Sequence, residues 1–191
     1  MEYSNGDNDR MSRDFLDIDK LSRAQGSLLG QLAGDSLGSL VEFRAPDDIR
    51  REYPSGVREL ADGGTWNTIA GQPTDDSEMA LLLARMLADQ GRYDPDEARK
   101  AYILWLDSGP FDCGMTVAGG LRGRPNPDSQ ANGAMMRISP LGIFGANHDA
   151  ELVAEWAQAV RIGATGGDTL SVKNLFDIPV SDIVAASKKP L

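Results

Sequence analysis

The chain has 191 residues, which suits one globular domain, and 41% of them are hydrophobic and 25% charged. Its net charge of −10 argues against general affinity for nucleic acid or for an anionic membrane, although a bound divalent cation would reverse the local sign. The single cysteine, Cys113, excludes an intramolecular disulfide. Because neither a signal-peptide pattern nor a long apolar run is visible, we expect a cytoplasmic protein without a membrane span.

The N-terminal part predicts a leader followed by a long helix. Residues 1–17 are polar and acidic, which is typical of a disordered leader. From residue 18 to 41, apolar residues recur at helical spacing. Glycine occupies every fourth position along one stripe of this helix, at Gly26, Gly30, Gly34 and Gly38. Glycine weakens a helix, so the stripe predicts close packing against another backbone or a ligand.

Residues 43–73 are rich in glycine and proline, which predicts an irregular surface segment with one short helix over residues 47–52. The stretch 74–90 is apolar almost all round and predicts a buried helix that ends at Gly91. More helical segments are predicted at residues 95–106, 115–121 and 149–162.

No segment has a strong strand pattern, so the predicted fold class is all-α. The expected organisation is one helical domain over residues 18–163, followed by an irregular C-terminal segment over residues 164–191.

The start of the buried helix carries Thr74, Asp75 and Asp76, and two interpretations stay open. Asp75 fits an N-cap with Glu78 three residues later, a variant of the capping box. Alternatively, two carboxylates and a hydroxyl are oxygen ligands suited to Mg²⁺, Mn²⁺ or Ca²⁺. These donors do not fill an octahedral shell, so the metal hypothesis requires ligands from elsewhere in the chain.

Further acids are candidates for a cleft. Asp35 and Glu42 lie seven residues apart, so an unbroken helix would place them on one face, either in a site or in solvent. Asp112 belongs to a loop rich in glycine and proline, where it either reaches into a cleft or forms a turn with its own backbone.

The remaining polar candidates lie later in the chain. Asn132 and Gly133 form a turn dipeptide, and Arg137 suits either a phosphate or a structural carboxylate. His148 is interpreted as a surface or capping residue. It would form a nucleophilic pair with Cys113 only if some feature lowered the thiol pKa, and none is visible.

Taken together, these segments resemble the ADP-ribosylglycohydrolase family, which includes the dinitrogenase reductase-activating glycohydrolases. The matching stretches occur in the family's order and are GSLLGQLAGDSLGSLVEF, GQPTDDSEMALLLARML, WLDSGPFDCG and SQANGAMMRISPLGIFGAN. The resemblance implies an all-α bundle whose cleft holds two Mg²⁺ or Mn²⁺ ions. It also implies hydrolysis of the bond between ADP-ribose and a protein side chain or a small acceptor.

The resemblance implies roles for particular residues of this chain. Metal ligands would be Thr74, Asp75 and Asp76, and the catalytic acids would be Glu42 and Asp112. ADP-ribose would be contacted in the cleft by Asp35, Asn132, Gly133 and Arg137.

The chain also departs from the family pattern. The family's second metal motif has the form Gly-Gly-Asp-x-Asp-Thr, and the only counterpart here reads GGDTLS. Asp168 matches the first acid as a metal ligand, but Leu170 stands at the second acid and Ser171 at the threonine. Because leucine cannot ligate a metal, an impaired relative that binds ADP-ribose or a protein is the alternative function. A shortened chain stable as a homo-oligomer is a third hypothesis.

Overall fold

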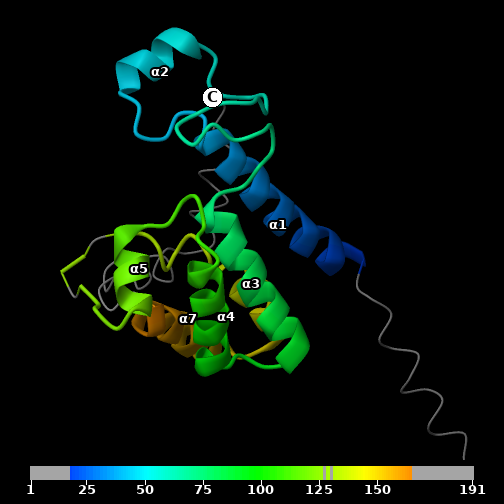
Figure 1. The fold of residues 1–191 in the computed structure, drawn as a ribbon. Coiled ribbons are helices and arrows are strands. Elements are labelled where there is room, and N and C mark those ends of the chain that lie inside the picture. The colour runs from blue at the N-terminus through cyan, green and yellow to red at the C-terminus, as the bar shows by residue number, and fades with distance from the viewer. Residues whose placement is uncertain (1–17, 127, 130, 165–191) are drawn as a thin grey trace, which may run out of the picture.

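The computed structural model describes residues 18–126, 128–129 and 131–164 (Figure 1). The helices in chain order are α1 Ile18–Gly38, α2 Pro46–Glu52, α3 Asp75–Gln90, α4 Pro95–Asp107, α5 Met115–Leu121, α6 Ser139–Phe144, the 3₁₀ helix η1 Gly145–Asn147, and α7 Ala150–Ala164. Within these ranges, strand-like pairing is confined to one isolated bridge between Gly63 and Thr68. The all-α prediction is therefore confirmed. The predicted leader, Asp168 and residues 165–191 lie outside the described residues.

The predicted ends of α3 and α4 agree with the structure because local signals set them. The helix predicted over residues 18–41 instead ends at Gly38, so Glu42 does not lie on the helix that carries Asp35. α3 ends at Gly91, which adopts a left-handed φ of 62° and donates its N–H to the carbonyl of Leu87. α4 begins at Pro95, and the side chain of Asp94 accepts the N–H groups of Asp96 and Glu97.

The hydrophobic core lies where α3 packs against α4 and α6, and where α7 packs against α4 and α5. Figure 1 shows α3, α4, α5 and α7 gathered in this bundle, with α1 along its edge and α2 set apart. The buried side chains at its centre include Met79, Leu83, Tyr102, Leu141 and Val160. Burying a side chain of this size contributes about 1.5–3 kcal/mol to the stability of the fold. The bundle therefore holds the ends of the surrounding loops in place.

α1 contacts this bundle through polar groups rather than through its glycine stripe. The Gln31 amide donates to the carbonyls of Asp76 and Met136, at 3.2 and 2.8 Å, and its oxygen accepts from the Ser139 hydroxyl. A Cβ built on any glycine of the stripe would meet no described atom within 4 Å. The prediction that the stripe packs against another backbone is therefore wrong for the described residues, because Gln31 holds the two surfaces together elsewhere.

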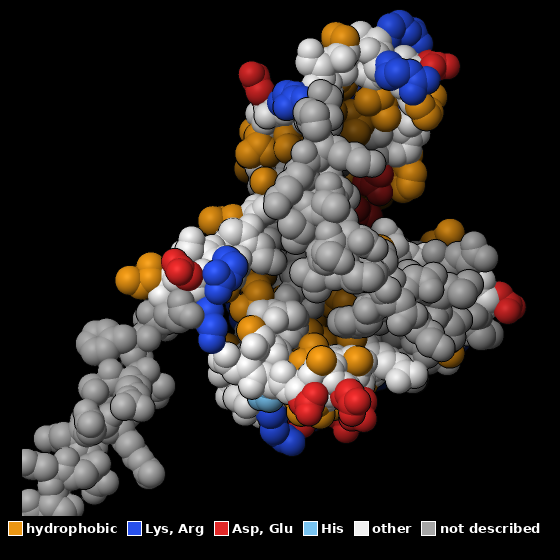
Figure 2. Space-filling view, turned by 180° about the vertical axis from the view of Figure 1, so that it is seen from behind, with side chains coloured by type: hydrophobic (Ala, Val, Ile, Leu, Met, Phe, Trp, Pro, Cys, Tyr) orange, Lys and Arg blue, Asp and Glu red, His pale blue; other side chains and the backbone are white. Residues whose placement is uncertain are grey.

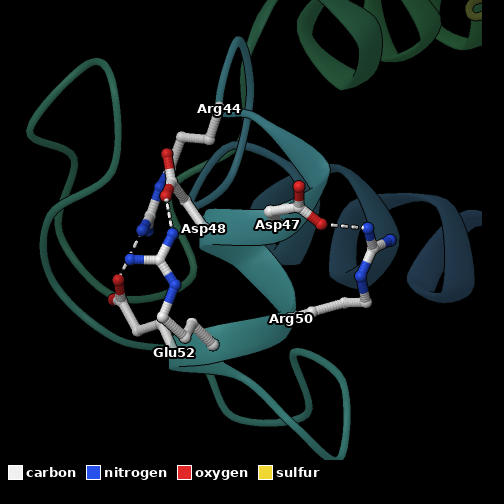
Figure 3. Close-up of polar contacts among 6 residues, drawn as sticks. Arg44, Asp47, Asp48, Arg50 and Glu52 are labelled. Atoms are coloured by element: carbon white, nitrogen blue, oxygen red, sulfur yellow. Dashed lines mark hydrogen bonds and ion pairs between the residues drawn. The ribbon is translucent and has the colours of Figure 1, made fainter.

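The irregular segment predicted over residues 43–73 contains α2 and a folded loop. Figure 3 shows Arg44 paired with Glu52, and Arg50 with Asp47, on the exposed surface of α2, where such pairs contribute little to stability. Gly64 brings the following loop against the end of α1, since a Cβ on it would lie 2.5 Å from the Ser39 carbonyl oxygen. This close approach positions the loop beside Glu42.

None of the helices in the described ranges is both long enough and apolar enough to cross a membrane.

Candidate active site

A pocket of about 340 Å³ opens between the C-terminal end of α1 and the N-terminal end of α3. Four carboxylates and a hydroxyl line it, from Asp35, Glu42, Thr74, Asp75 and Asp76. Gly34, Gly38, Ser39 and Val41 form the adjoining wall, so two glycines of the stripe face this pocket. The fold thus brings two of the sequence-predicted segments together.

Asp35 of α1 caps the start of α3. One of its carboxylate oxygens, Oδ2, accepts the N–H groups of Thr74 and Ser77 at 3.0 and 3.2 Å, and the other, Oδ1, accepts the Thr74 hydroxyl at 2.7 Å. A negative charge at this position also meets the positive end of the helix. Asp35 therefore fixes the geometry of the whole Thr74–Asp76 corner.

The capping interpretation of Asp75 is wrong. Thr74 is the N-cap residue, and its own side chain makes no capping hydrogen bond because Asp35 supplies the acceptor instead. Glu78 does not return to the helix start, since its carboxylate accepts the indole N–H of Trp105 at 2.7 Å. Asp75 remains available for another role.

Asp75 links α3 to the loop before α5. The residue is 7% exposed, and its carboxylate accepts the N–H of Gly114 at 3.2 Å. Burial raises the pKa of Asp75; the Gly114 hydrogen bond opposes this, and the charges of Asp35 and Glu42 raise the pKa further. The hydrogen bond holds the Asp112 loop against the pocket.

Two carboxylates here titrate near neutral pH. Burial, followed by repulsion from Asp35, Asp75 and Glu42, raises the pKa of Asp76 to about 6. Burial, followed by repulsion from the acids of the pocket, raises the pKa of Asp112 to about 7. Asp112 is not among the pocket-lining residues, but it lies close enough to share their field. A carboxylate with such a pKa is suited to exchange protons at neutral pH.

Glu42 is held by an aromatic residue that sequence reasoning missed. The Glu42 carboxylate accepts the indole N–H of Trp66 at 2.7 Å, and its backbone carbonyl accepts the Thr65 hydroxyl at 2.6 Å. The available signal was a lone tryptophan within a segment rich in glycine. Trp66 therefore fixes the position of the second predicted catalytic acid.

The oxygens of Thr74, Asp75 and Asp76 are of the kind that binds a hard divalent cation, but they make up only part of its coordination shell. Carboxylate and hydroxyl oxygens at one corner are the ligands that Mg²⁺ and Mn²⁺ prefer. Across the described ranges, however, no three His, Cys, Asp or Glu side chains are gathered closely enough to hold a metal ion. The oxygens of Asp35 are also engaged with α3.

Arg137 lies in the core rather than in the pocket. Its side chain is 0% exposed, donates to the carbonyls of Gly133 and Val160 at 2.5 and 3.3 Å, and stands 5.0 Å from the ring centroid of Tyr102. A fully buried guanidinium cannot contact ADP-ribose in this conformation, so its placement corrects the expectation for Arg137. The structural alternative for Arg137 predicted pairing with a carboxylate. Its partners are instead the backbone carbonyls of Gly133 and Val160 and the Tyr102 ring.

The Asn132–Gly133 turn is present, since the Asn132 carbonyl accepts the N–H groups of Met135 and Met136. Asn132 is exposed and Gly133 is buried, and neither lines the pocket.

The Cys113–His148 pair gains no support. Burial and the charges of Asp75 and Asp112 raise the pKa of Cys113, which makes its thiolate scarcer. His148 is exposed and stacks on Phe144, with ring centroids 5.3 Å apart, as expected for a surface residue.

The sequence model of the ADP-ribosylglycohydrolase family matches residues 16–168. The chain belongs to the ADP-ribosylglycohydrolase family. It is 38% identical over 140 residues to the ADP-ribosyl-[dinitrogen reductase] glycohydrolase of Rhodospirillum rubrum, covering 68% of this chain and 47% of that protein. It is 32% identical over 157 residues to the ADP-ribosylarginine hydrolase Tri1 of Pseudomonas putida (strain GB-1), and the match covers 73% of this chain and 40% of that protein.

A solved structure described as an ADP-ribosylglycohydrolase-related protein complex aligns with a TM-score of 0.65 and 25% identity, covering 82% of this chain and 53% of that one. This ADP-ribosylglycohydrolase chain thus spans less than half of each of the two curated relatives named above and about half of the similar structure. The family assignment confirms the resemblance.

Proposed function

We propose that the chain hydrolyses the bond between ADP-ribose and a modified protein side chain or small acceptor. The observation that carries the proposal is the pocket lined by four carboxylates between α1 and α3, with Asp112 close enough to share their field. Family membership supports the same reaction, because the named relatives are ADP-ribosyl hydrolases.

Asp112 is the proposed general base. Its carboxylate can take a proton from a water molecule and later give it to the leaving acceptor. Attack of that water at the anomeric carbon of the ribose passes through an oxocarbenium-like state, which nearby negative charge stabilises. Glu42, positioned by Trp66, is the second catalytic candidate and would supply that charge.

We further propose that Mg²⁺ or Mn²⁺ binds at Thr74, Asp75 and Asp76, with two ions as in the family resemblance. Such ions would orient the ribose hydroxyls, polarise water and offset the pyrophosphate charge. The crowding of carboxylates without a lysine or arginine among the pocket-lining residues supports a cationic occupant. Because the described ligands form only part of a shell, water, substrate or Asp168 would complete it.

The substrate proposed first is an ADP-ribosylated protein modified on arginine. The Pseudomonas putida relative is named an ADP-ribosylarginine hydrolase, and the Rhodospirillum rubrum relative acts on a modified protein. Asp35 is proposed to act on the substrate indirectly, through the Thr74–Asp76 corner that it caps. Asn132, which is exposed, remains a predicted contact for ADP-ribose.

A second candidate is a relative that binds ADP-ribose or a partner protein without turnover. Two observations favour it: the absence of a gathered metal site within the described ranges, and Leu170 at the position of a family acid.

Turnover separates the two candidates. The whole chain is incubated with an ADP-ribosylated arginine peptide and Mg²⁺, and released ADP-ribose is measured by chromatography. We expect release by the wild type and a fall in kcat of about 10²- to 10⁴-fold in Asp112→Asn. Glu59→Gln, which removes an exposed loop carboxylate, is the matched control.

Binding of ADP-ribose without release would favour the second candidate. Equal release by Asp112→Asn and the wild type would transfer the role of base to Glu42.

A further inference from the structure

Three aromatic side chains from separate segments meet beside the acid pocket. Phe43 follows α1, Trp66 belongs to the loop after α2, and Phe111 precedes α5. The Trp66 ring makes edge-to-face contacts with both phenylalanines, with centroids 6.4 Å from Phe43 and 6.2 Å from Phe111. We call Phe43, Trp66 and Phe111 the aromatic rim.

The rim is not a buried core. Phe43 is 81% exposed and Phe111 is 40% exposed. Phe43 also has a φ of +59°, a left-handed conformation that bulky side chains rarely adopt. An exposed ring held in an unfavourable backbone conformation gains little from burial, and such strain clusters at ligand-binding sites.

The rim adjoins the acids directly. Trp66 donates its indole N–H to Glu42, which lines the pocket and immediately precedes Phe43. Phe111 immediately precedes Asp112, the proposed base. Figure 2 shows hydrophobic side chains on the upper part of the molecule beside a recess that holds acidic side chains. The rim thus meets the pocket through the Trp66–Glu42 contact, although none of its three rings lines the pocket.

The charge of this opening is negative. The residues lining the pocket include four carboxylates and neither a lysine nor an arginine. The cation next to the rim in sequence, Arg44, is paired with Glu52 of α2, as Figure 3 shows. The charge of Arg44 is thus engaged away from the rim.

Aromatic faces combined with carboxylates recognise a planar cation. The face of an aromatic ring carries negative partial charge, and a guanidinium both stacks on it and pairs with carboxylates. We infer that the aromatic rim is the subsite for the guanidinium of the acceptor, and that it favours arginine linkages over serine linkages. This inference rests on the proposed function and assigns its acceptor.

A binding experiment tests the rim without turnover. Chemical-shift titration of the whole chain compares Nα-acetylarginine methylamide with the citrulline analogue, which has nearly the same shape but no charge. We expect the arginine probe to bind more tightly. In Phe43→Leu its affinity falls about two- to fivefold, the range for losing one cation–π contact at an exposed site. Phe43→Tyr keeps the ring and should keep the affinity, and Ile69→Ala removes an exposed apolar side chain outside the rim as a control.

A kinetic experiment tests selection. The ratio of kcat/KM for ADP-ribosylarginine over ADP-ribosylserine peptides should fall about two- to fivefold in Phe43→Leu and stay constant in Ile69→Ala. An unchanged ratio, or equal binding of arginine and citrulline probes, would overturn the inference. The chain could also fail to hydrolyse the peptides while still preferring the arginine probe, with Phe43→Leu abolishing that preference. This result would refute the proposed function but leave the inference about the rim intact.

Discussion

Replacing Asp76 with asparagine should stabilise the chain at neutral pH in the absence of divalent cations. Burial and the charges of Asp35, Asp75 and Glu42 raise the pKa of Asp76 from 3.8 to about 6. In a fully shielded site this would correspond to about 3 kcal/mol. Asp76 is only half-buried, so screening reduces the expected gain to about 1 kcal/mol, or about 2–4 °C in Tm.

The stabilisation expected from Asp76→Asn depends on pH. The folded chain binds the Asp76 proton more tightly than the unfolded chain, so its contribution to stability is greatest below about pH 4. That stability is lost as the pH rises to about 6, and the raised pKa of Asp112 extends the loss toward pH 7. Thermal unfolding in EDTA should therefore show that Asp76→Asn has a higher Tm than the wild type at pH 8 but not at pH 3.5. Glu59→Gln is the control, and an equal gain at both pH values would refute the repulsion argument.

Further predictions concern the two contacts that build the site. Asp35→Ala should cost about 1–2 kcal/mol in urea unfolding, because the start of α3 loses its acceptor. Asp35→Asn, which keeps an acceptor oxygen, should cost less, and equal losses would show that the cap is not the cause. Gly64→Ala should cost at least about 1–2 kcal/mol more than Gly56→Ala. Both have positive φ, but only at Gly64 does a Cβ meet Ser39. Equal Tm values would contradict that close approach.

The helices were predictable because their signals are local. The apolar run predicted a buried helix at α3, which is buried on one face while Leu81 is 38% exposed. Gly91 and Pro95 set the end of α3 and the start of α4 within a residue or two of the structure. The family's ordered motifs likewise sufficed to identify the bundle, which the comparisons confirm.

The contacts that build the site were not predictable because they join distant segments. Asp35 caps α3 across 39 residues, and Trp66 binds Glu42 across 24. No local pattern distinguishes a carboxylate that caps its own helix from one that caps a neighbour. The capping box expected at Asp75 failed for this reason.

Two expectations concerned contacts whose partner composition does not reveal. Arg137 follows a polar turn and suggested a ligand, yet carbonyls and the Tyr102 ring satisfy it inside the core. The glycine stripe of α1 predicted packing against another backbone or a ligand. No described backbone packs on it, and Gly34 and Gly38 face the pocket.

Calorimetric titration of the whole chain with ADP-ribose, with and without Mg²⁺, tests most directly the claim that the pocket between α1 and α3 is an ADP-ribose site. We predict binding that depends on Mg²⁺ and is lost in the double variant Asp75→Ala/Asp76→Ala. Binding of equal affinity without Mg²⁺ would contradict the metal proposal, and no binding under either condition would contradict the site itself.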